Sequence, residues 1–508
     1  MKQTQRVLAL LLCGVLLFLF AGCSPAALFG QNKYLIMEWS EWTSEDGTVY
    51  AVSADGNVAK LGGEGACAII LPNGKKALVR DEDGSTLSLM NMKTGKAEKV
   101  YTGEGEIELD DIGSETMVVF WVEGKAGGEA FVIFDLKHGK EIATFEEDDE
   151  DLSIAVAQNL YTEAAVAVAY TQNGAVYTYV SGAKEAKKLC TLDDAKKNKL
   201  QYVSQDGKVV VFTEYQKNDA SSVTVKMQYG KKQTEICTRT LGAGETVSAD
   251  GSADGKLVAV AVGEKLYLVK NGKAADPVTI SGLGSGRNSL GATYTDKDYL
   301  SCDRGNIGGV YLQVDNTVYY CSAEGEKTKV LGDVSRYEIY KNKICYIKNE
   351  SMYVAKIKKG QLSDEKKICS NASYVGVFSE DGKYLYYKSK DDTLYAYKFG
   401  EDSARRVASN VWIYDITPKG DEVAFLSDRK QIEGYLFTYT LQKYVYKKDK
   451  CTTVADGVGY TITGMDGYID SDNFVYTEYA GKDKEGKVLW DLKHYNGKKS
   501  KTVLTNVR

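Results

Sequence analysis

The sequence predicts an all-β fold, and three observations lead to this prediction. A turn of the form Ser-x-Asp-Gly-Lys, followed by an apolar run, occurs at 204–208, 252–256 and 379–383. Phrases ending in Leu-Tyr or Val-Tyr follow these turns, as at Leu266-Tyr267. Glycine is frequent at 50 residues and tyrosine at 36, whereas proline is rare at 4, a composition typical of many strands joined by tight turns. Such a repeat indicates the architecture of the whole chain.

The segment from Ala372 to Ser409 contains the repeating unit in full. It divides into four predicted strands, at 374–378, 384–388, 393–397 and 404–408. Gly382 lies in the turn between the first two, where it is free to adopt a positive φ. Four short antiparallel strands in roughly 40 residues form one blade of a β-propeller.

About ten or eleven such units fit into the chain, whereas a closed ring usually has four to eight blades. We therefore predict two tandem propellers, at 33–280 and 290–508, joined by the Gly- and Ser-rich segment 281–289. The alternative is a single ring of about eight blades with long insertions. Residues 34–37 are a candidate for the strand that closes the ring.

The first residues predict an export signal. Lys2 and Arg6 precede an apolar stretch, and the small residues Ala21-Gly22 lead directly to Cys23. The apolar stretch is shorter than the roughly 20 residues that a membrane-spanning helix needs, which is the alternative interpretation. The cysteine after Ala-Gly resembles the lipobox of bacterial lipoproteins. This resemblance implies a signal peptide at 1–22, a lipidated Cys23 and a tether at 23–32.

The Ser-x-Asp-Gly-Lys phrase resembles the WD40-like (PD40-type) repeats of TolB-like propellers. The form usual in that family has Pro at the second position, which this chain retains in Thr417-Pro418-Lys419-Gly420-Asp421. The resemblance implies a propeller that acts as a docking platform for protein partners. Family likeness at the level of a repeat indicates the fold and leaves the function open.

Charge and cysteine content limit the function classes. The net charge of −6 argues against binding to nucleic acid, which requires a basic surface. Without Cys13 and Cys23, eight cysteines remain, and their scattered positions favour small buried side chains over a disulfide framework. A set of disulfides stays the alternative, because an exported protein permits them.

Few residues offer recognisable catalytic chemistry. His138 and His494 are the only histidines, and both occur in phrases predicted to be surface turns. No Gly-x-Ser-x-Gly sequence is present, and two histidines make a Ser-His-Asp triad or a His-based zinc site improbable. We therefore assign no catalytic residue, metal ligand or cofactor.

Carboxylates and aromatic residues are the remaining candidates for ligand binding. Acidic stretches at 146–151, 81–84 and 466–473 are predicted to be solvated loops, with a weak Ca²⁺ site as the alternative. Aromatic residues could form stacking platforms or, as the favoured interpretation, fill the spaces between blades. They are Trp39, Trp42, Tyr384, Tyr386, Tyr387, Tyr395 and Tyr397.

These observations predict a non-enzymatic lipoprotein outside the cytoplasm, anchored to the bacterial cell membrane through Cys23. Its propeller is expected to bind a protein or a cell-wall glycan at the cell surface, with the ligand-binding residues unassigned. The alternative is an enzyme that works in the funnel of the propeller, namely a glycosidase, lyase or esterase that uses carboxylates.

Overall fold

The structure is a computed structural model of the whole chain. It describes residues 39–53, 55–109, 114–123, 128–146, 152–158, 165–193, 196–216, 219–285, 290, 294–295, 308–372, 374–379, 381–462 and 473–507. Cys23 and the predicted signal peptide, tether and strand 34–37 lie outside these residues, as do Cys302 and most of the acidic stretches 146–151 and 466–473. Within the described residues, no helix is long and apolar enough to cross a lipid bilayer.

The described strands form ten sheets. The strands of the first five sheets are β1 (Trp39–Thr43), β2 (Val49–Ser53) and β3 (Val58–Gly62); β4 (Cys67–Ile70), β5 (Lys76–Arg80), β6 (Thr86–Asn91) and β7 (Ala97–Thr102); β8 (Ile107–Glu108), β9 (Met117–Glu123), β10 (Glu129–Asp135) and β11 (Lys140–Glu146); β12 (Ile154–Gln158), β13 (Ala165–Gln172), β14 (Ala175–Val180) and β15 (Lys187–Thr191); and β16 (Lys196–Val203), β17 (Val209–Gln216), β18 (Asp219–Tyr229) and β19 (Lys232–Thr240).

The strands of the last five sheets are β20 (Val247–Gly251), β21 (Leu257–Val262), β22 (Lys265–Lys270), β23 (Lys273–Ala274) and β24 (Val278–Thr279); β25 (Tyr294–Thr295), β26 (Gly309–Val314), β27 (Thr317–Ser322) and β28 (Lys327–Leu331); β29 (Val334–Tyr340), β30 (Lys343–Lys348), β31 (Ser351–Lys358) and β32 (Gln361–Cys369); β33 (Val377–Phe378), β34 (Tyr384–Lys388), β35 (Leu394–Lys398) and β36 (Arg405–Ala408); and β37 (Val411–Ile416), β38 (Glu422–Glu433), β39 (Leu436–Val445), β40 (Lys450–Ile462), β41 (Phe474–Lys482), β42 (Val488–Tyr495) and β43 (Ser500–Val507). A single turn of 3₁₀-helix, η1 (Tyr446–Lys448), precedes β40.

The predicted all-β propeller of four-stranded antiparallel blades is confirmed. The segment used to define the repeat forms the sheet β33–β34–β35–β36, with each strand paired antiparallel to its neighbour. The second strand has the predicted bounds, 384–388, and the third and fourth begin one residue later than predicted. The first strand is shorter than predicted, at 377–378 in place of 374–378, so Tyr374 precedes it. Seven of the ten sheets have four strands in this sequential order.

The repeated turn has the same hydrogen bonds wherever the Ser-x-Asp-Gly-Lys phrase occurs. In the third copy the Ser379 hydroxyl donates to Asp381 Oδ1 at 2.9 Å and accepts the Tyr384 backbone N–H at 3.0 Å. The same carboxylate accepts the backbone N–H of Lys383 at 2.8 Å, and Gly382 has a φ of 65°. The turns at 204–208 and 252–256 repeat this network. The phrase is therefore a structural corner that connects the first and second strands of a blade.

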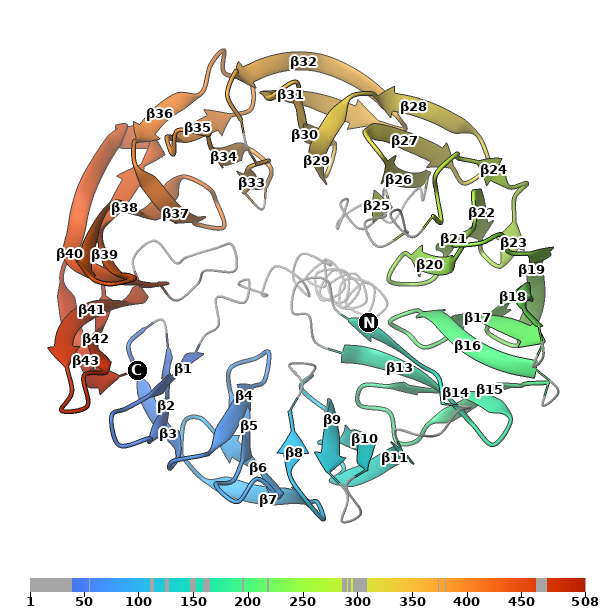
Figure 1. Cartoon of the computed structure of the whole chain (residues 1–508), viewed down its shortest axis with the longest axis horizontal. Helices are drawn as coiled ribbons and strands as arrows, with labels where there is room; N and C mark the ends of the chain where they lie inside the picture. The colour runs from blue at the N-terminus through green and yellow to red at the C-terminus, as the bar shows by residue number, and fades with distance from the viewer. Residues whose placement is uncertain are drawn as a thin grey trace, which may run out of the picture.

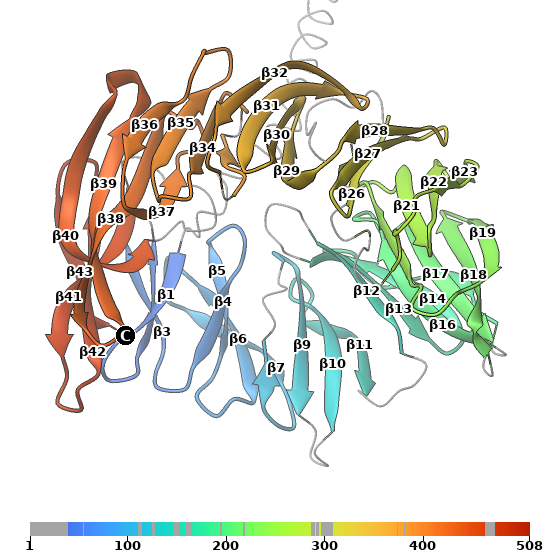
Figure 2. The ribbon, with the colours of Figure 1, turned by 45° about the horizontal axis from the view of Figure 1, so that its top comes forward.

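The sheets follow one another around a single ring, in contrast to the two tandem rings that we predicted (Figure 1). Figure 2 shows the same ring tilted, with neighbouring sheets side by side along it. A buried apolar cluster joins each sheet to the next one in chain order. A further cluster of Val52, Val475, Leu492 and Val507 joins the last sheet to the first, and Ser44 bridges to Val507.

The described part of the predicted junction, residues 281–285, contributes to this continuous core. Leu283 is 1% exposed, and it lies in the cluster that joins the sheet of β20–β24 to the sheet of β25–β28. Ile280 and Leu290, on either side of the junction, are buried in the same cluster. A segment that contributes buried side chains to both neighbouring sheets cannot act as a linker between separate domains, because separation would expose this apolar surface.

The seven-stranded sheet β37–β43 accounts for the eleventh repeat unit. A buried cluster that includes Leu426, Leu441, Phe474 and Tyr476 packs its first strands against its later ones. The two halves therefore contact each other as neighbouring blades do, while β40 remains paired with both β39 and β41. The number of blades in this ring agrees with the predicted ten or eleven units, and it is larger than the eight or so blades of the alternative prediction.

Candidate binding site

Three successive blades place large exposed side chains at corresponding positions beside their inner strands. β29, β33 and β37 are the strands nearest the centre of the ring in their sheets (Figure 1). Arg336, Tyr374 and Trp412 occupy corresponding positions, each four residues before the last residue of β29, β33 and β37, respectively. Tyr374 is 59% exposed and Trp412 is 43% exposed, whereas most aromatic side chains of the ring are packed between blades.

Each of the two exposed aromatic rings is covered on one side by an arginine. The guanidinium carbon of Arg336 lies 4.6 Å from the centre of the Tyr374 ring. The guanidinium carbon of Arg429, which is in β38, lies 4.7 Å from the centre of the Trp412 ring and 3.4 Å from that of Phe437. We call these five residues the inner-rim patch. A guanidinium group that lies over the face of an aromatic ring is attracted to it by a cation–π interaction and can still donate hydrogen bonds from its N–H groups.

Neither arginine of the inner-rim patch has a carboxylate partner among the described residues. Three other arginines of the ring do pair with glutamates: Arg80 with Glu106 at 2.9 Å, Arg239 with Glu245 at 3.2 Å and Arg405 with Glu401 at 3.2 Å. Arg336 and Arg429 are both exposed. The patch therefore offers two available cations beside two available aromatic faces, a combination that can bind carboxylate groups bidentately.

A hairpin beside Trp412 extends the apolar surface. β38 and β39 are joined at Gly434 and Tyr435, and all residues from Asp428 to Tyr435 are exposed. Tyr435 is 99% exposed and Ile432 is 38% exposed. An ion pair between Glu433 and Lys482 of β41 holds the hairpin tip against the next strands. Exposed aromatic and aliphatic side chains on a fixed hairpin are typical of surfaces that contact a partner.

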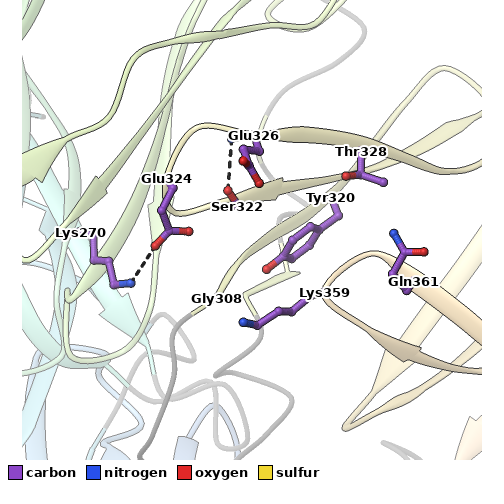
Figure 3. A pocket seen from close by; sticks show the side chains of 9 residues that line it. All are labelled: Lys270, Gly308, Tyr320, Ser322, Glu324, Glu326, Thr328, Lys359 and Gln361. Atoms are coloured by element: carbon purple, nitrogen blue, oxygen red, sulfur yellow. Dashed lines mark hydrogen bonds and ion pairs between the residues drawn. The ribbon is translucent and has the colours of Figure 1, made fainter.

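A pocket of about 340 Å³ lies elsewhere on the ring, between the sheets of β20–β24, β25–β28 and β29–β32. Figure 3 shows its lining, which is polar and carries both signs of charge: Lys270, Gly308, Tyr320, Ser322, Glu324, Glu326, Thr328, Lys359 and Gln361. Lys270 donates to Glu324 at 3.2 Å, and this hydrogen bond lowers the pKa of the Glu324 carboxyl. The pocket can accommodate a small polar molecule.

Most of the aromatic residues considered from the sequence belong to the core, as the favoured interpretation predicted. Tyr386 and Tyr387 have no exposed surface, and Tyr384 and Tyr397 are also buried. Tyr395 stacks on Tyr387 with ring centres 5.3 Å apart. Trp42 packs against the cluster that closes the ring. These residues therefore stabilise the scaffold, and none of them lies in the inner-rim patch.

The two histidines lie in different environments, although their phrases look alike. His138 is in the turn between β10 and β11, as predicted, with Nδ1 2.5 Å from Asp135 Oδ2. His494 lies inside β42, because the turn of its phrase falls at 496–499. The prediction of a surface turn is thus wrong for His494, which is partly buried. Two extra residues, Tyr495 and Asn496, separate His494 from Gly497 and move the turn two residues further along the chain.

The described acidic residues and cysteines have structural surroundings. Asp81 Oδ1 accepts the backbone N–H groups of Ser85 and Thr86, both at 3.1 Å, so this carboxylate stabilises a turn. No group of three or more His, Cys, Asp or Glu side chains among the described residues could hold a metal ion. The described cysteines are free thiols, of which Cys321 and Cys345 are buried.

The inner-rim patch was not predicted from the sequence. Tyr374 occurs in a predicted strand, where a tyrosine is expected to be buried between blades, and Trp412 lies outside the strands that we predicted. A signal was present, because both residues lie five positions before the Ser or Thr that starts the next corner, Ser379 and Thr417. Alignment of the repeats on these corners brings the two aromatic residues into register.

Comparisons with known proteins give similarity at the level of the fold. No family model matches the chain, and no curated protein matches it in sequence. Among solved structures, a eukaryotic initiation factor is 10% identical with a TM-score of 0.41 and covers 80% of this chain and 93% of its own. Dipeptidyl peptidase 4 of Porphyromonas gingivalis is 12% identical with a TM-score of 0.37, over 84% of this chain and 64% of its own.

A dipeptidyl aminopeptidase IV candidate from Bacteroides ovatus is also 12% identical, with a TM-score of 0.34, over 83% of this chain and 63% of its own. The chain thus spans less than two thirds of both peptidases. Two of these three structures are described as peptidases, which contradicts the prediction that the chain is not an enzyme, and that exclusion is withdrawn. Similarity this low assigns no activity to the chain.

Proposed function

We propose that this protein is a membrane-anchored binding protein outside the cytoplasm, and that the inner-rim patch receives an acidic protein partner. The observation that supports this proposal is the pair of arginines, Arg336 and Arg429, that stack on exposed aromatic rings and have no carboxylate partner among the described residues. Carboxylates of a partner would satisfy both guanidinium groups, and the aromatic faces would exclude water around them.

The chemistry of the patch favours a protein over a glycan. Trp, Tyr and Arg are the residues most enriched in the energetically dominant parts of protein–protein interfaces. The neighbouring Ile432 and Tyr435 add exposed apolar surface, which the side chains of a protein partner can cover. Binding to a glycan is therefore an outcome that the experiment must distinguish.

Anchoring is proposed from the sequence, since Cys23 lies outside the described residues. Acyl chains on this cysteine would retain the protein at the membrane, because each buried methylene contributes about 0.8 kcal/mol. Cys23→Ala is expected to release the protein or to leave an unprocessed precursor. A correctly processed Cys23→Ala protein that stays at the membrane would contradict the anchor while leaving the proposal for the patch intact.

The binding proposal is tested by capture from solubilised membranes with the wild-type protein and the double variant Arg336→Gln/Arg429→Gln. We expect one stoichiometric protein partner on the wild type and its loss from the variant. Arg406→Gln is the matched control, because Arg406 is exposed and bonded to Ser409 outside the patch. Equal capture by both proteins, or enrichment of glycan in place of protein, would overturn the proposal.

A further inference from the structure

The polar pocket of Figure 3 contains two charges that the protein does not neutralise. Of its four charged residues, Lys270 and Glu324 pair with each other at 3.2 Å. Glu326 and Lys359 have no ion pair with any described residue. In Figure 3 these two side chains lie on opposite sides of Tyr320. The pocket therefore presents one unmatched negative group and one unmatched positive group across a single aromatic side chain.

Both unmatched side chains project from tightly constrained turns. Lys359 and Gly360 form the two-residue turn between β31 and β32, with φ values of 47° and 76°. The backbone N–H of Gly360 donates to the hydroxyl of Tyr311 at 3.0 Å, and the Tyr311 ring packs on Tyr320 with centres 4.8 Å apart. The backbone below Lys359 is thus fixed by the pocket wall itself.

The turn that carries Glu326 is fixed in a similar way. Its backbone N–H donates to Ser322 Oγ at 3.2 Å, and its carbonyl accepts the Ser322 backbone N–H at 2.8 Å. Gly325 adopts a φ of 91°, which only glycine readily permits. Because both backbones are held in place before any ligand arrives, a ligand that matches the two charges has to order only the Lys359 and Glu326 side chains.

We propose that this pocket binds a small zwitterion, a free amino acid or a dipeptide, independently of the inner-rim patch. The carboxylate of the ligand pairs with Lys359 and its α-ammonium group pairs with Glu326. The volume of about 340 Å³ lies near the lower end of ligand pockets, which suits a molecule of this size. A ligand with one charge would leave the other protein charge unmatched, and a neutral sugar would leave both.

The test is a thermal-shift screen of the full chain with the twenty amino acids and a set of alanine-containing dipeptides, followed by calorimetry of the best ligand. We expect the N-acetylated and the C-amidated forms of that ligand to bind about ten- to a hundredfold more weakly, as loss of one charge-assisted hydrogen bond predicts. Lys359→Met should weaken the free ligand by a similar factor and leave the C-amidated form unchanged. Glu326→Gln should likewise weaken binding of the free ligand and leave binding of the N-acetylated form unchanged.

Lys358→Met is the matched control, because this exposed neighbour does not line the pocket. It should bind every form as the wild type does. All three substitutions are at exposed positions, so circular dichroism and the melting temperature of the unliganded proteins should not change. The proposal is overturned if no zwitterion binds, if the blocked forms bind as well as the free one, or if a neutral sugar binds more tightly.

Discussion

Closure of the ring between its first and last sheets can be tested by coupling two buried side chains from opposite ends of the chain. Val52 of β2 and Leu492 of β42 have no exposed surface and share one apolar cluster. Leu492→Ala is expected to cost 2–5 kcal/mol, as do other buried leucine truncations, and Val52→Ala about 2 kcal/mol. Because both side chains line one cluster, the double variant should depart from additivity by at least about 0.5 kcal/mol.

A second pair of substitutions gives the opposite expectation. Leu266 of β22 is equally buried, but it belongs to the cluster between the sheets of β20–β24 and β25–β28. Val52→Ala and Leu266→Ala should therefore be additive within about 0.5 kcal/mol. In two separate rings, β20–β24 would instead close against β1–β3, so Val52 would couple to Leu266 and not to Leu492. Urea denaturation of all single and double variants measures the coupling energy of each pair. Coupling of Val52 to Leu266, with additivity between Val52 and Leu492, would refute the single ring.

Three further predictions concern the scaffold. Glu214 is 3% exposed and lies between Lys196 at 3.1 Å and Lys226 at 2.7 Å, so Glu214→Gln should lower the free energy of unfolding by about 3 kcal/mol in urea denaturation. Asp364→Asn, which breaks an exposed ion pair with Lys356, should lower it by less than about 1 kcal/mol. Equal losses for the two variants would contradict this prediction. Ser379→Ala should cost about 1–2 kcal/mol by leaving a buried backbone N–H without its acceptor, and a melting temperature equal to wild type would show that the corner does not need this hydroxyl. Burial raises the pKa of Cys321 and Cys345 from 9.0 to about 12, so the folded state holds these protons more tightly than the unfolded state. Their contribution to stability is therefore complete below about pH 9 and declines by about 1.4 kcal/mol per thiol and pH unit up to pH 12. The free energy of unfolding of Cys345→Ala should therefore fall less than that of the wild type between pH 9 and 11. Parallel pH profiles of the two proteins would refute the raised pKa of Cys345.

The local structure of the blades could be predicted because it depends on short-range chemistry. Ser379, Asp381 and Gly382 build one corner by hydrogen bonds and a positive φ, and each requirement is visible in the sequence. The number of rings could not be predicted in the same way. It depends on the small rotation between neighbouring sheets, which no single residue encodes, and on the burial of Leu283 inside a segment that has the composition of a linker.

The inner-rim patch was harder to predict than the fold for a related reason. Tyr374 and Tyr384 are both tyrosines in strand-like sequences, yet the first is 59% exposed and the second 8%. Which one is covered depends on how closely neighbouring blades approach at each radius of the ring. The arginines add a second difficulty, since Arg336 and Arg429 are far apart in sequence and only the folded ring brings both beside exposed aromatic residues.

The claim that the inner-rim patch binds a protein partner is tested most directly by the affinity of the captured partner for the wild type, Trp412→Ala and Arg429→Gln. Both side chains lie in the stacked group that we expect to dominate the interface, where truncation typically costs 2 kcal/mol or more, equivalent to about thirtyfold in Kd. We therefore predict at least tenfold weaker binding by each variant, with Arg406→Gln unchanged. Affinities of the two patch variants within twofold of wild type would contradict the claim.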